Sequence, residues 1–399
     1  MAITDKKTGP WGLDQVYNKI NQGSIWNYYL LSEQPGALYA WGQNERGNLG
    51  LNDRDMRSSP TQVGSGTDWA SVLKNGFSSS AGGAIKSDGT LWTWGRNEDG
   101  AMGINAGDID YSSPVQVPGT TWSHGAMGDK QMYVIRTDGT LWCWGSNGNG
   151  MLGQNQANAQ LARVSSPVQI PGTTWAYITS GWSSVWGTKT DGTLWAWGGN
   201  TKGELGQNNT TKYSSPVQIP GTTWTMTRNN HTSSRVVRVI KTDGTLWSWG
   251  YNGQAALGLN DKTQRSSPTQ IPGTDWSSIG GDAYCGLGVK TDGALWTWGY
   301  NDKGNLGHND RTYRSSPIQV GSDTNWDIAT ATGGLSTPVY ALKTDGTFWS
   351  WGYGSQGQLG HNNQTQYSSP IQIPGTWLTN PTHFISAVNA SAMSIKPSA

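Results

Sequence analysis

The stretch KSDGTLWTWGRNEDGAMGIN, Lys86 to Asn105, decides the fold, because the chain spells nearly the same twenty residues repeatedly. The skeleton returns at Arg136 as RTDGTLWCWGSNGNGMLGQN and at Lys189 as KTDGTLWAWGGNTKGELGQN. The tryptophan of each WG step recurs every 49 to 53 residues, at Trp41, Trp94, Trp144, Trp197, Trp249, Trp298 and Trp351. A period of about fifty residues is typical of propellers and solenoids. The sequence therefore predicts seven units of one repeat architecture.

Each unit reads as four short strands. A strand at SSP is followed by a PGT turn, a strand opened by tryptophan, a loop, a strand ending at IKTD and a final LWxWG strand. The DG step between the last two strands supplies the positive φ that a two-residue hairpin needs. Four antiparallel strands per unit make a propeller blade. The paired tryptophans of LWxWG then have the bulk to fill the wedges between neighbouring blades.

The two ends of the repeat region complement each other. The first LWxWG-like strand, ALYAWG at Ala37–Gly42, has no IKTD strand before it, whereas the C-terminal AMSIKPSA matches that strand through Ile395 and Lys396. We therefore expect an all-β fold: a seven-bladed β-propeller of four-stranded antiparallel blades over residues 36–399, closed by pairing of the two termini. Closure removes free sheet edges, which ranks a ring above an open solenoid.

Composition excludes several function classes. Charged residues make up 13% of the chain and the formal net charge is +1, so no footprint for nucleic acid or an anionic membrane is present. No signal peptide and no apolar run long enough to cross a membrane is visible. Cys143 and Cys285 lie at non-equivalent positions, which gives no support for a disulfide. His308 and His361 share one slot of adjacent units but lack ligand spacing, so we expect no metal and no cofactor.

The motif DGTLWxWGxNxxGxLGxN followed by SSPVQIPGTxW resembles the regulator-of-chromosome-condensation repeat family. The resemblance covers about Gly36 to Lys396 and implies a seven-bladed propeller. Members include guanine-nucleotide exchange factors for a small GTPase, an inhibitor of β-lactamase and bacterial or viral proteins of unassigned role, so the fold transfers and the function does not. The second tryptophan, the near-neutral charge and the missing wedge insertion all argue against exchange activity.

Residues 1–35 lie outside the repeat and read as an N-terminal arm with a short amphipathic helix. A helix of about ten residues is marginal alone in water, so the arm needs a partner surface. The arm is similar to the openings of structural proteins of tailed phages, and this resemblance implies docking onto a virion. The alternative is that the arm packs against its own propeller. The expected docking residues are Trp11, Leu13, Val16, Tyr17, Ile20 and Trp26.

Positions that repeat in every unit serve packing and turning, so we expect function where the units differ. Two connections vary in length: the loop after the Trp-opened strand, and the long link from LGxN to SSP, interpreted as the link to the next blade. In an antiparallel meander both emerge on one face, which becomes the candidate binding surface. Its expected residues, all on these connections, are Phe77, Arg228, Asn229, Asn230, His231, Leu335, Gln160 and Arg163.

The preferred interpretation is a non-enzymatic structural and binding propeller of a phage virion, at the tail, fibre or capsid surface. Its expected partners are other virion structural proteins, host surface glycan or protein, and further copies of itself on the virion, with assembly in the host cytoplasm. One alternative is a soluble protein-binding propeller, an inhibitor or a GTPase regulator. Another is a glycan-active enzyme using loop carboxylates such as Asp53, Asp55, Asp108 and Asp110, although solvated loop charge is the commoner explanation.

Overall fold

The computed structural model describes residues 35–75, 81–156, 159–226, 235–331, 338–375, 386–388 and 391–397. The chain separates into two units, Met1–Gln34 and Pro35–Ala399, and all described residues belong to the second. The predicted arm helix and its docking residues therefore lie outside the described residues. Apart from two single 3-10 turns, η1 (Glu98–Gly100) and η2 (Gly148–Gly150), the regular structure described is β-strand. The all-β class is confirmed.

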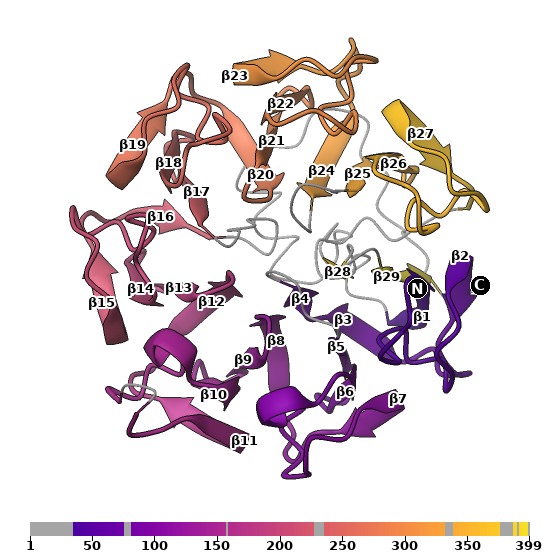
Figure 1. Ribbon diagram of the computed structural model, residues 1–399, viewed down its shortest axis with the longest axis vertical. Coiled ribbons are helices and arrows are strands. Elements are labelled where there is room, and N and C mark those ends of the chain that lie inside the picture. The colour runs from indigo at the N-terminus through magenta and orange to yellow at the C-terminus, as the bar shows by residue number, and fades with distance from the viewer. Residues whose placement is uncertain are drawn as a thin grey trace, which may run out of the picture. The chain divides into compact units, whose positions relative to one another are not determined.

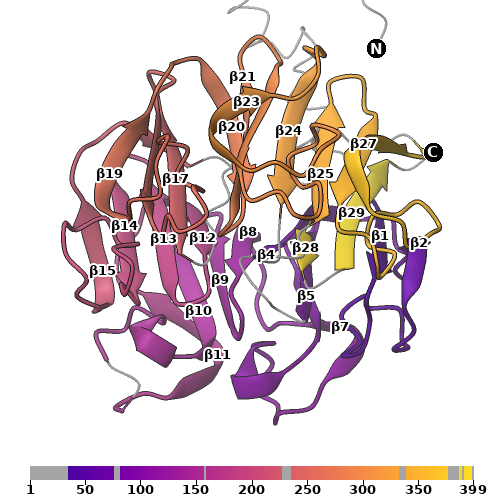
Figure 2. The ribbon, with the colours of Figure 1, turned by 45° about the horizontal axis from the view of Figure 1, so that its top comes forward.

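Within the described residues, the strands form seven four-stranded antiparallel blades arranged in a ring (Figure 1). Figure 2 shows the strands of each blade running between the two faces of this ring. The innermost strands, numbered here from blade 1 to blade 7, are β3 (Trp69–Val72), β8 (Trp122–Met127), β12 (Trp175–Ser180), β16 (Trp224–Thr225), β20 (Trp276–Gly281), β24 (Trp326–Ala331) and β28 (Ser386–Val388). The second strands are β5 (Ala81–Lys86), β9 (Gln131–Arg136), β13 (Ser184–Lys189), β17 (Val236–Lys241), β21 (Cys285–Lys290), β25 (Pro338–Lys343) and β29 (Ser391–Pro397).

The outer half of each blade consists of the LWxWG strand and the SSP strand. The third strands are β6 (Leu91–Gly95), β10 (Leu141–Ser146), β14 (Leu194–Gly198), β18 (Leu246–Gly250), β22 (Leu295–Gly299), β26 (Phe348–Gly352) and β1 (Gly36–Gly42). The outermost strands are β7 (Tyr111–Gln116), β11 (Arg163–Ile170), β15 (Tyr213–Ile219), β19 (Arg265–Ile271), β23 (Arg314–Gln319), β27 (Tyr367–Ile373) and β2 (Arg57–Gln62). A short extra strand, β4 (Lys74–Asn75), pairs in parallel with β8.

The structure corrects one detail of the repeat unit. The SSP strand does not open a blade; it pairs with the LWxWG strand before it, as β10 pairs β11 through Leu141 opposite Ile170. The long link from LGxN to SSP therefore stays inside one blade, and the PGT segment leads to the next blade. The sequence pattern alone could not place this boundary, because a repeat has no intrinsic starting point.

Blade 7 contains strands from both ends of the described region. β1 pairs antiparallel with β29 in an unbroken register, from Gly36 opposite Pro397 to Gly42 opposite Ser391. Its outer strand β2 comes from the N-terminal part of the chain, and its inner strands β28 and β29 come from the C-terminal part. A single bridge between Gly36 and Trp69 connects this sheet to blade 1.

The WG tryptophan joins each blade to the one before it. Trp144 is fully buried, and its Nε1–H donates to the Ala101 carbonyl of blade 1 at 2.9 Å. The same bond recurs at all seven junctions, at 2.7 to 3.0 Å. Gly103 allows this approach, since its φ is +70° and a Cβ there would lie 2.6 Å from the Trp144 ring. The wedge-filling role predicted for this tryptophan is confirmed.

The first tryptophan of LWxWG has a different role from the predicted one. Trp142 packs edge-on against Trp122, the residue that opens the blade, with ring centroids 6.4 Å apart. The Arg136 guanidinium lies over both rings, 4.5 Å from Trp122 and 4.2 Å from Trp142. In blades 1 and 3 to 6 a lysine takes the place of this arginine. Cation–π attraction inside one blade, and not filling of the wedge between blades, fixes this tryptophan.

The loop face of the propeller as the candidate functional site

The strand order gives the ring two unlike faces. On the turn face lie the DG hairpins between second and third strands. On the opposite side, which we call the loop face, lie the loops between first and second strands and the links between third and fourth strands. An antiparallel meander puts both of these connections at the same end of a blade, as predicted.

The turn face is nearly the same from blade to blade. In blade 2, Asp138 Oδ1 accepts from the Thr140 backbone N–H at 2.9 Å and from the Thr140 hydroxyl at 2.6 Å. The Thr140 hydroxyl oxygen accepts in turn from Trp142 Nε1–H at 2.9 Å. These hydrogen bonds, the hydroxyl bond being the largest cause, lower the pKa of Asp138. The predicted DG hairpins are confirmed, and their aspartates serve the turn.

Asn105 and its counterparts in LGxN are also structural. The backbone N–H of Asn105 donates to the Ser165 carbonyl in the outer strand of the next blade at 2.8 Å. Asn105 and its six counterparts all make this bond, at 2.7 to 3.1 Å, with φ between +52° and +62°. Asparagine tolerates this left-handed conformation better than most residues. Their repetition thus reflects the joining of blades.

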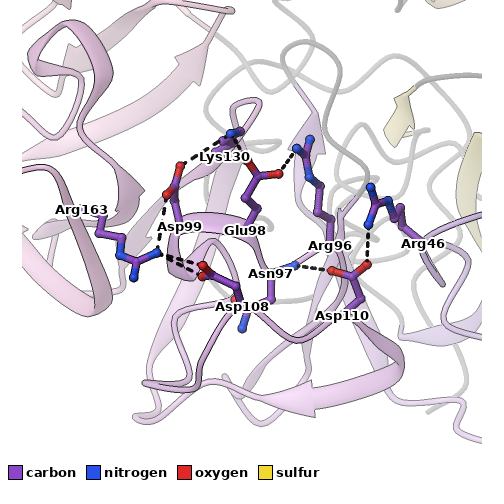
Figure 3. A network of polar contacts seen from close by, with 9 residues as sticks. All are labelled: Arg46, Arg96, Asn97, Glu98, Asp99, Asp108, Asp110, Lys130 and Arg163. Atoms are coloured by element: carbon purple, nitrogen blue, oxygen red, sulfur yellow. Dashed lines mark hydrogen bonds and ion pairs between the residues drawn. The ribbon is translucent and has the colours of Figure 1, made fainter.

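The loop face of blades 7, 1 and 2 carries a network of ion pairs (Figure 3). Arg163, one of the predicted binding residues, pairs with Asp108 at 3.0 Å and with Asp99 at 3.6 Å. Lys130 from blade 2 pairs with Glu98 and, at 3.6 Å, with Asp99. Arg163 thus contacts a neighbouring blade, while Gln160, three residues before it, is exposed to solvent.

Three of the four carboxylates considered for an enzyme are ion-paired on this face. Asp110 Oδ2 pairs with Arg46 of blade 7 at 3.2 Å, and Asp110 Oδ1 accepts from the Asn97 backbone N–H at 3.2 Å. Asp53 pairs with Arg57 and accepts from the Asn44 side-chain amide at 3.0 Å. Paired in this way, Asp53, Asp108 and Asp110 hold the loops together. This arrangement accords with the interpretation of these residues as loop charge.

Blade 5 presents aromatic side chains on the same face. The Tyr300 ring lies between Tyr284 and Tyr313, with centroid distances of 6.1 and 5.0 Å. Asp302 accepts from both the Tyr300 and the Tyr313 hydroxyl groups at 2.7 Å, which lowers the pKa of Asp302. Burial, followed by these hydrogen bonds to Asp302, raises the pKa of Tyr300. Asp302 thus holds the Tyr300 and Tyr313 hydroxyl groups in place.

Trp182 extends the aromatic surface on blade 3. Its side chain is 46% exposed, and the Arg235 guanidinium lies 5.0 Å from its ring. Arg235 also acts electrostatically on Tyr284 across the blade boundary. We call Trp182, Arg235, Tyr284, Tyr300 and Tyr313 the aromatic cluster.

The structure describes two of the predicted binding residues, Gln160 and Arg163, and the binding role of all of them stays a prediction. Phe77, Arg228, Asn229, Asn230, His231 and Leu335 lie outside the described residues and stay predictions. The aromatic cluster was missed, although Trp182 carries a readable signal: it falls outside the tryptophan positions of the repeat.

The two histidines in equivalent slots do not face each other. His308 Nε2 bonds the Thr297 hydroxyl at 3.0 Å and His361 Nε2 bonds the Ser350 hydroxyl at 2.8 Å, each within its own blade. Among the described residues, no three His, Cys, Asp or Glu side chains gather as metal ligands would. No described helix is long and apolar enough to span a membrane.

Comparisons with known proteins agree with this architecture. The RCC1-like domain model matches residues 37–395. The X-linked retinitis pigmentosa GTPase regulator of Mus musculus is 39% identical over 80 residues, 20% of this chain and 8% of that protein. The ultraviolet-B receptor UVR8 of Arabidopsis thaliana is 33% identical over 98 residues, 23% of this chain and 20% of that protein. The matches thus span a small part of these relatives.

Solved structures show the same fold at low identity. Human WBSCR16 superposes with a TM-score of 0.78 at 16% identity, covering 91% of this chain and 100% of that one. Prp20p of Saccharomyces cerevisiae, described together with its binding to Gsp1p and histones, superposes with a TM-score of 0.76 at 17% identity, covering 94% and 96%. The motif, the blade architecture and the matched range of residues agree, and the chain belongs to the RCC1-like domain family.

Proposed function

We propose that this protein is a protein-binding propeller whose loop face receives the partner, with the aromatic cluster at the centre of the contact. The observation that carries this proposal is a pre-organised set in which Trp182 and Tyr313 are exposed and Arg235 and Tyr300 are half-buried. Tryptophan, tyrosine and arginine dominate the energetics of protein interfaces. The pairing of Asp302 with two tyrosines reduces the side-chain entropy that binding would otherwise cost.

The family relationship supports the same class of function. The relatives named above include a GTPase regulator and a protein described as binding Gsp1p and histones. Protein binding is thus the function that agrees best with the names of these similar proteins. It corresponds to the second of the functions expected from the sequence.

Differential capture tests this proposal. Wild-type chain and the double variant Trp182→Ala with Tyr313→Ala are used as baits in cross-linked pull-downs from cells that produce the protein, and bound proteins are quantified by mass spectrometry. We expect the double variant to lose a defined partner by about tenfold or more, since hot-spot residues contribute about 2 kcal/mol or more each.

The control is Ile318→Ala, which removes an apolar side chain that is 41% exposed on the outer strand β23, away from the loop face. Capture by this variant should match the wild type. If both variants lose the same partners, or neither loses any, the loop face is not the binding surface.

The narrower virion role is a separate proposal, supported by the sequence pattern of the arm alone. The relatives named above are not virion proteins, and the arm lies outside the described residues. Light scattering of the full chain and of a chain starting at Gly36, each mixed with candidate virion proteins, tests docking, virion location and self-assembly together. Assembly of the full chain only would support the virion role; equal behaviour of both chains would refute it.

We also propose that pairing of β1 with β29 is what closes the ring in solution. The uninterrupted register from Gly36 to Gly42 supports this, as does the hydrogen bond from Trp41 Nε1–H to the Gln358 carbonyl at 3.0 Å. Truncation of β29, described below, is the test.

A further inference from the structure

A second surface feature lies at the junction between blades 7 and 1. A cavity of about 340 Å³ opens there, lined by Trp69, Lys86 and Trp92 of blade 1 and by Gln62, Gly64 and Gly66 of blade 7 and the link that follows it. Small-molecule sites begin at about 300 Å³ and combine apolar side chains with a few polar groups. This groove is separate from the aromatic cluster.

The link from blade 7 to blade 1 differs from most others in the chain. Five links read PGT after the outer strand, whereas this one reads Gly64–Ser65–Gly66. It is one residue longer than the four PGT links in which a single residue separates PGT from the next tryptophan. The link from blade 5 to blade 6 has the same length and reads Gly321–Ser322–Asp323. The two long links thus differ at one key position, Gly66 against Asp323.

That difference determines which carboxylate pairs with the lysine that lies over the two indoles, and how far this lysine is exposed. Asp323 pairs with Lys343 at 2.6 Å, and the Lys343 side chain is 9% exposed. At the other junction Gly66 provides no side chain, Lys86 pairs with Asp68 at 3.1 Å, and the Lys86 side chain is 22% exposed. Gly66 therefore leaves space beside the lysine where Asp323 supplies a carboxylate.

The chemistry of the groove points to a neutral, hydroxyl-rich ligand. Lys86 lies 5.2 and 5.1 Å from the Trp69 and Trp92 rings, so two indoles flank the polar group. The Lys86 charge is balanced by Asp68, which removes the net attraction for an anion while leaving ammonium N–H donors. The Gln62 amide and the Asn52 amide in the lining add donors and acceptors.

We propose that this groove binds a single carbohydrate residue, free or at the end of a glycan. The half-buried Trp92 indole offers apolar surface to the C–H face of a sugar ring, while Lys86 and the amides hydrogen-bond its hydroxyl groups. A purely apolar ligand would leave these polar groups unpaired, which costs free energy. A carboxylate ligand would meet the carboxylate of Asp68 beside the lysine.

Saturation-transfer difference NMR on the full chain tests the proposal. The probes are the methyl glycosides of glucose, galactose, mannose and N-acetylglucosamine, with sodium acetate and sodium benzoate as anionic probes. The key variant is Gly66→Asp with Asp68→Asn, which copies the sequence of the closed junction, where Asn325 follows Asp323 by two residues. The fold tolerates it, since the only close contacts of a Cβ at Gly66 are Asp68 Oδ1 at 3.0 Å and Trp69 Nε1 at 3.6 Å.

Two single variants serve as controls. Ser65→Asp adds a negative charge in the same link at an exposed residue that does not line the groove. Asp68→Asn alone leaves the groove open. Thermal unfolding confirms that each variant is folded before binding is measured.

We expect at least one glycoside to bind, the double variant to weaken that binding by about tenfold or more, and Ser65→Asp to leave it within about twofold. Asp68→Asn alone should retain measurable binding. Binding of acetate or benzoate but no glycoside would overturn the ligand class. No binding of any probe, or equal binding by wild type and double variant, would overturn the site. Trp182→Ala should leave glycoside binding unchanged, which separates this site from the loop face.

Discussion

On the turn face, Asp138, Thr140 and Trp142 form a hydrogen-bonded unit that returns around the ring with little change. On the loop face, blade 2 offers Lys130 and Arg163 in ion pairs, whereas blade 5 offers Tyr284 and Tyr300 in an aromatic cluster. The same strands connect the two faces. The difference shows that the repeat retains the residues that every blade needs for packing. Residues that do not take part in this packing differ from blade to blade.

Removing the pairing of β1 with β29 in blade 7 is expected to destabilise the propeller most. Ending the chain after residue 390 removes β29 and leaves β1 paired with β2 on one side only. We expect a loss of more than about 4 kcal/mol in the free energy of unfolding, with aggregation through the exposed edge. Urea denaturation and size-exclusion chromatography measure both effects. An unchanged unfolding midpoint would show that the termini do not close the ring.

Substitution of two tryptophans compares a residue that packs between blades with one that we propose for partner binding. Trp249→Ala removes a fully buried side chain and its hydrogen bond to the Glu204 carbonyl, so we expect a loss of about 3–5 kcal/mol. Trp182→Ala removes an exposed side chain, so we expect a stability change within about 0.5 kcal/mol. Urea denaturation of both variants provides the measurement. A large loss for Trp182→Ala would mean that the aromatic cluster supports the fold.

Blade 5 departs from the turn-face pattern and offers a gain of stability. Ala294 stands where other blades have threonine, and the Trp296 Nε1–H is buried without a hydrogen-bond partner among the described residues. Ala294→Thr should supply the missing acceptor and add about 0.5–1.5 kcal/mol. The reverse change, Thr245→Ala in blade 4, should cost a similar amount. If Ala294→Thr destabilises the chain, the repeated turn is not transferable between blades.

The smallest expected effect concerns pH. Hydrogen bonds from Thr140 lower the pKa of Asp138, so its ionised form stabilises the fold above the unfolded-state pKa, and this contribution is lost as the pH falls through the folded-state pKa. On the loop face, burial raises the pKa of Asp129. Its contribution to the free energy of unfolding is therefore present below the unfolded-state pKa and is lost as the pH rises through the folded-state pKa.

NMR titration of the aspartate carboxyl carbons compares these two groups directly. Thr140→Val removes the hydroxyl donor and should move the Asp138 pKa up toward its ordinary value, while the Asp129 pKa stays unchanged. The reverse outcome, an unmoved Asp138, would mean that the Thr140 hydroxyl does not stabilise the turn carboxylate.

Much of the blade architecture could be predicted from the sequence, because the residues that form its turns and its contacts between blades recur in each unit. The DG hairpins, the buried WG tryptophans and the LGxN asparagines each recur often enough to be recognised as structure. The blade boundary was misplaced because the SSP strand is equally compatible with either neighbour. The clamp of Arg136 between Trp122 and Trp142 was missed because its three residues come from three different strands.

The proposed binding surface was harder to predict from the sequence for a related reason. Trp182, Arg235 and Tyr300 lie in three different blades and gain meaning only when the ring brings those blades side by side. Arg163 was identified from an unusually long link, but its ion pairs with Asp99 and Asp108 depend on the neighbouring blade. Within one sequence, neither kind of contact leaves a local pattern.

The paired ends of blade 7 occupy the place that a DG hairpin fills in the other six blades, since Pro397 lies opposite Gly36 at the end of the ladder. Joining these residues through such a turn would give a circular polypeptide. The junction bonds of Trp41 and its six counterparts are the same at every position around the ring. New termini could then be opened at the DG hairpin of another blade. This propeller is therefore suited to circular permutation and to genetic fusion at a chosen hairpin of its turn face.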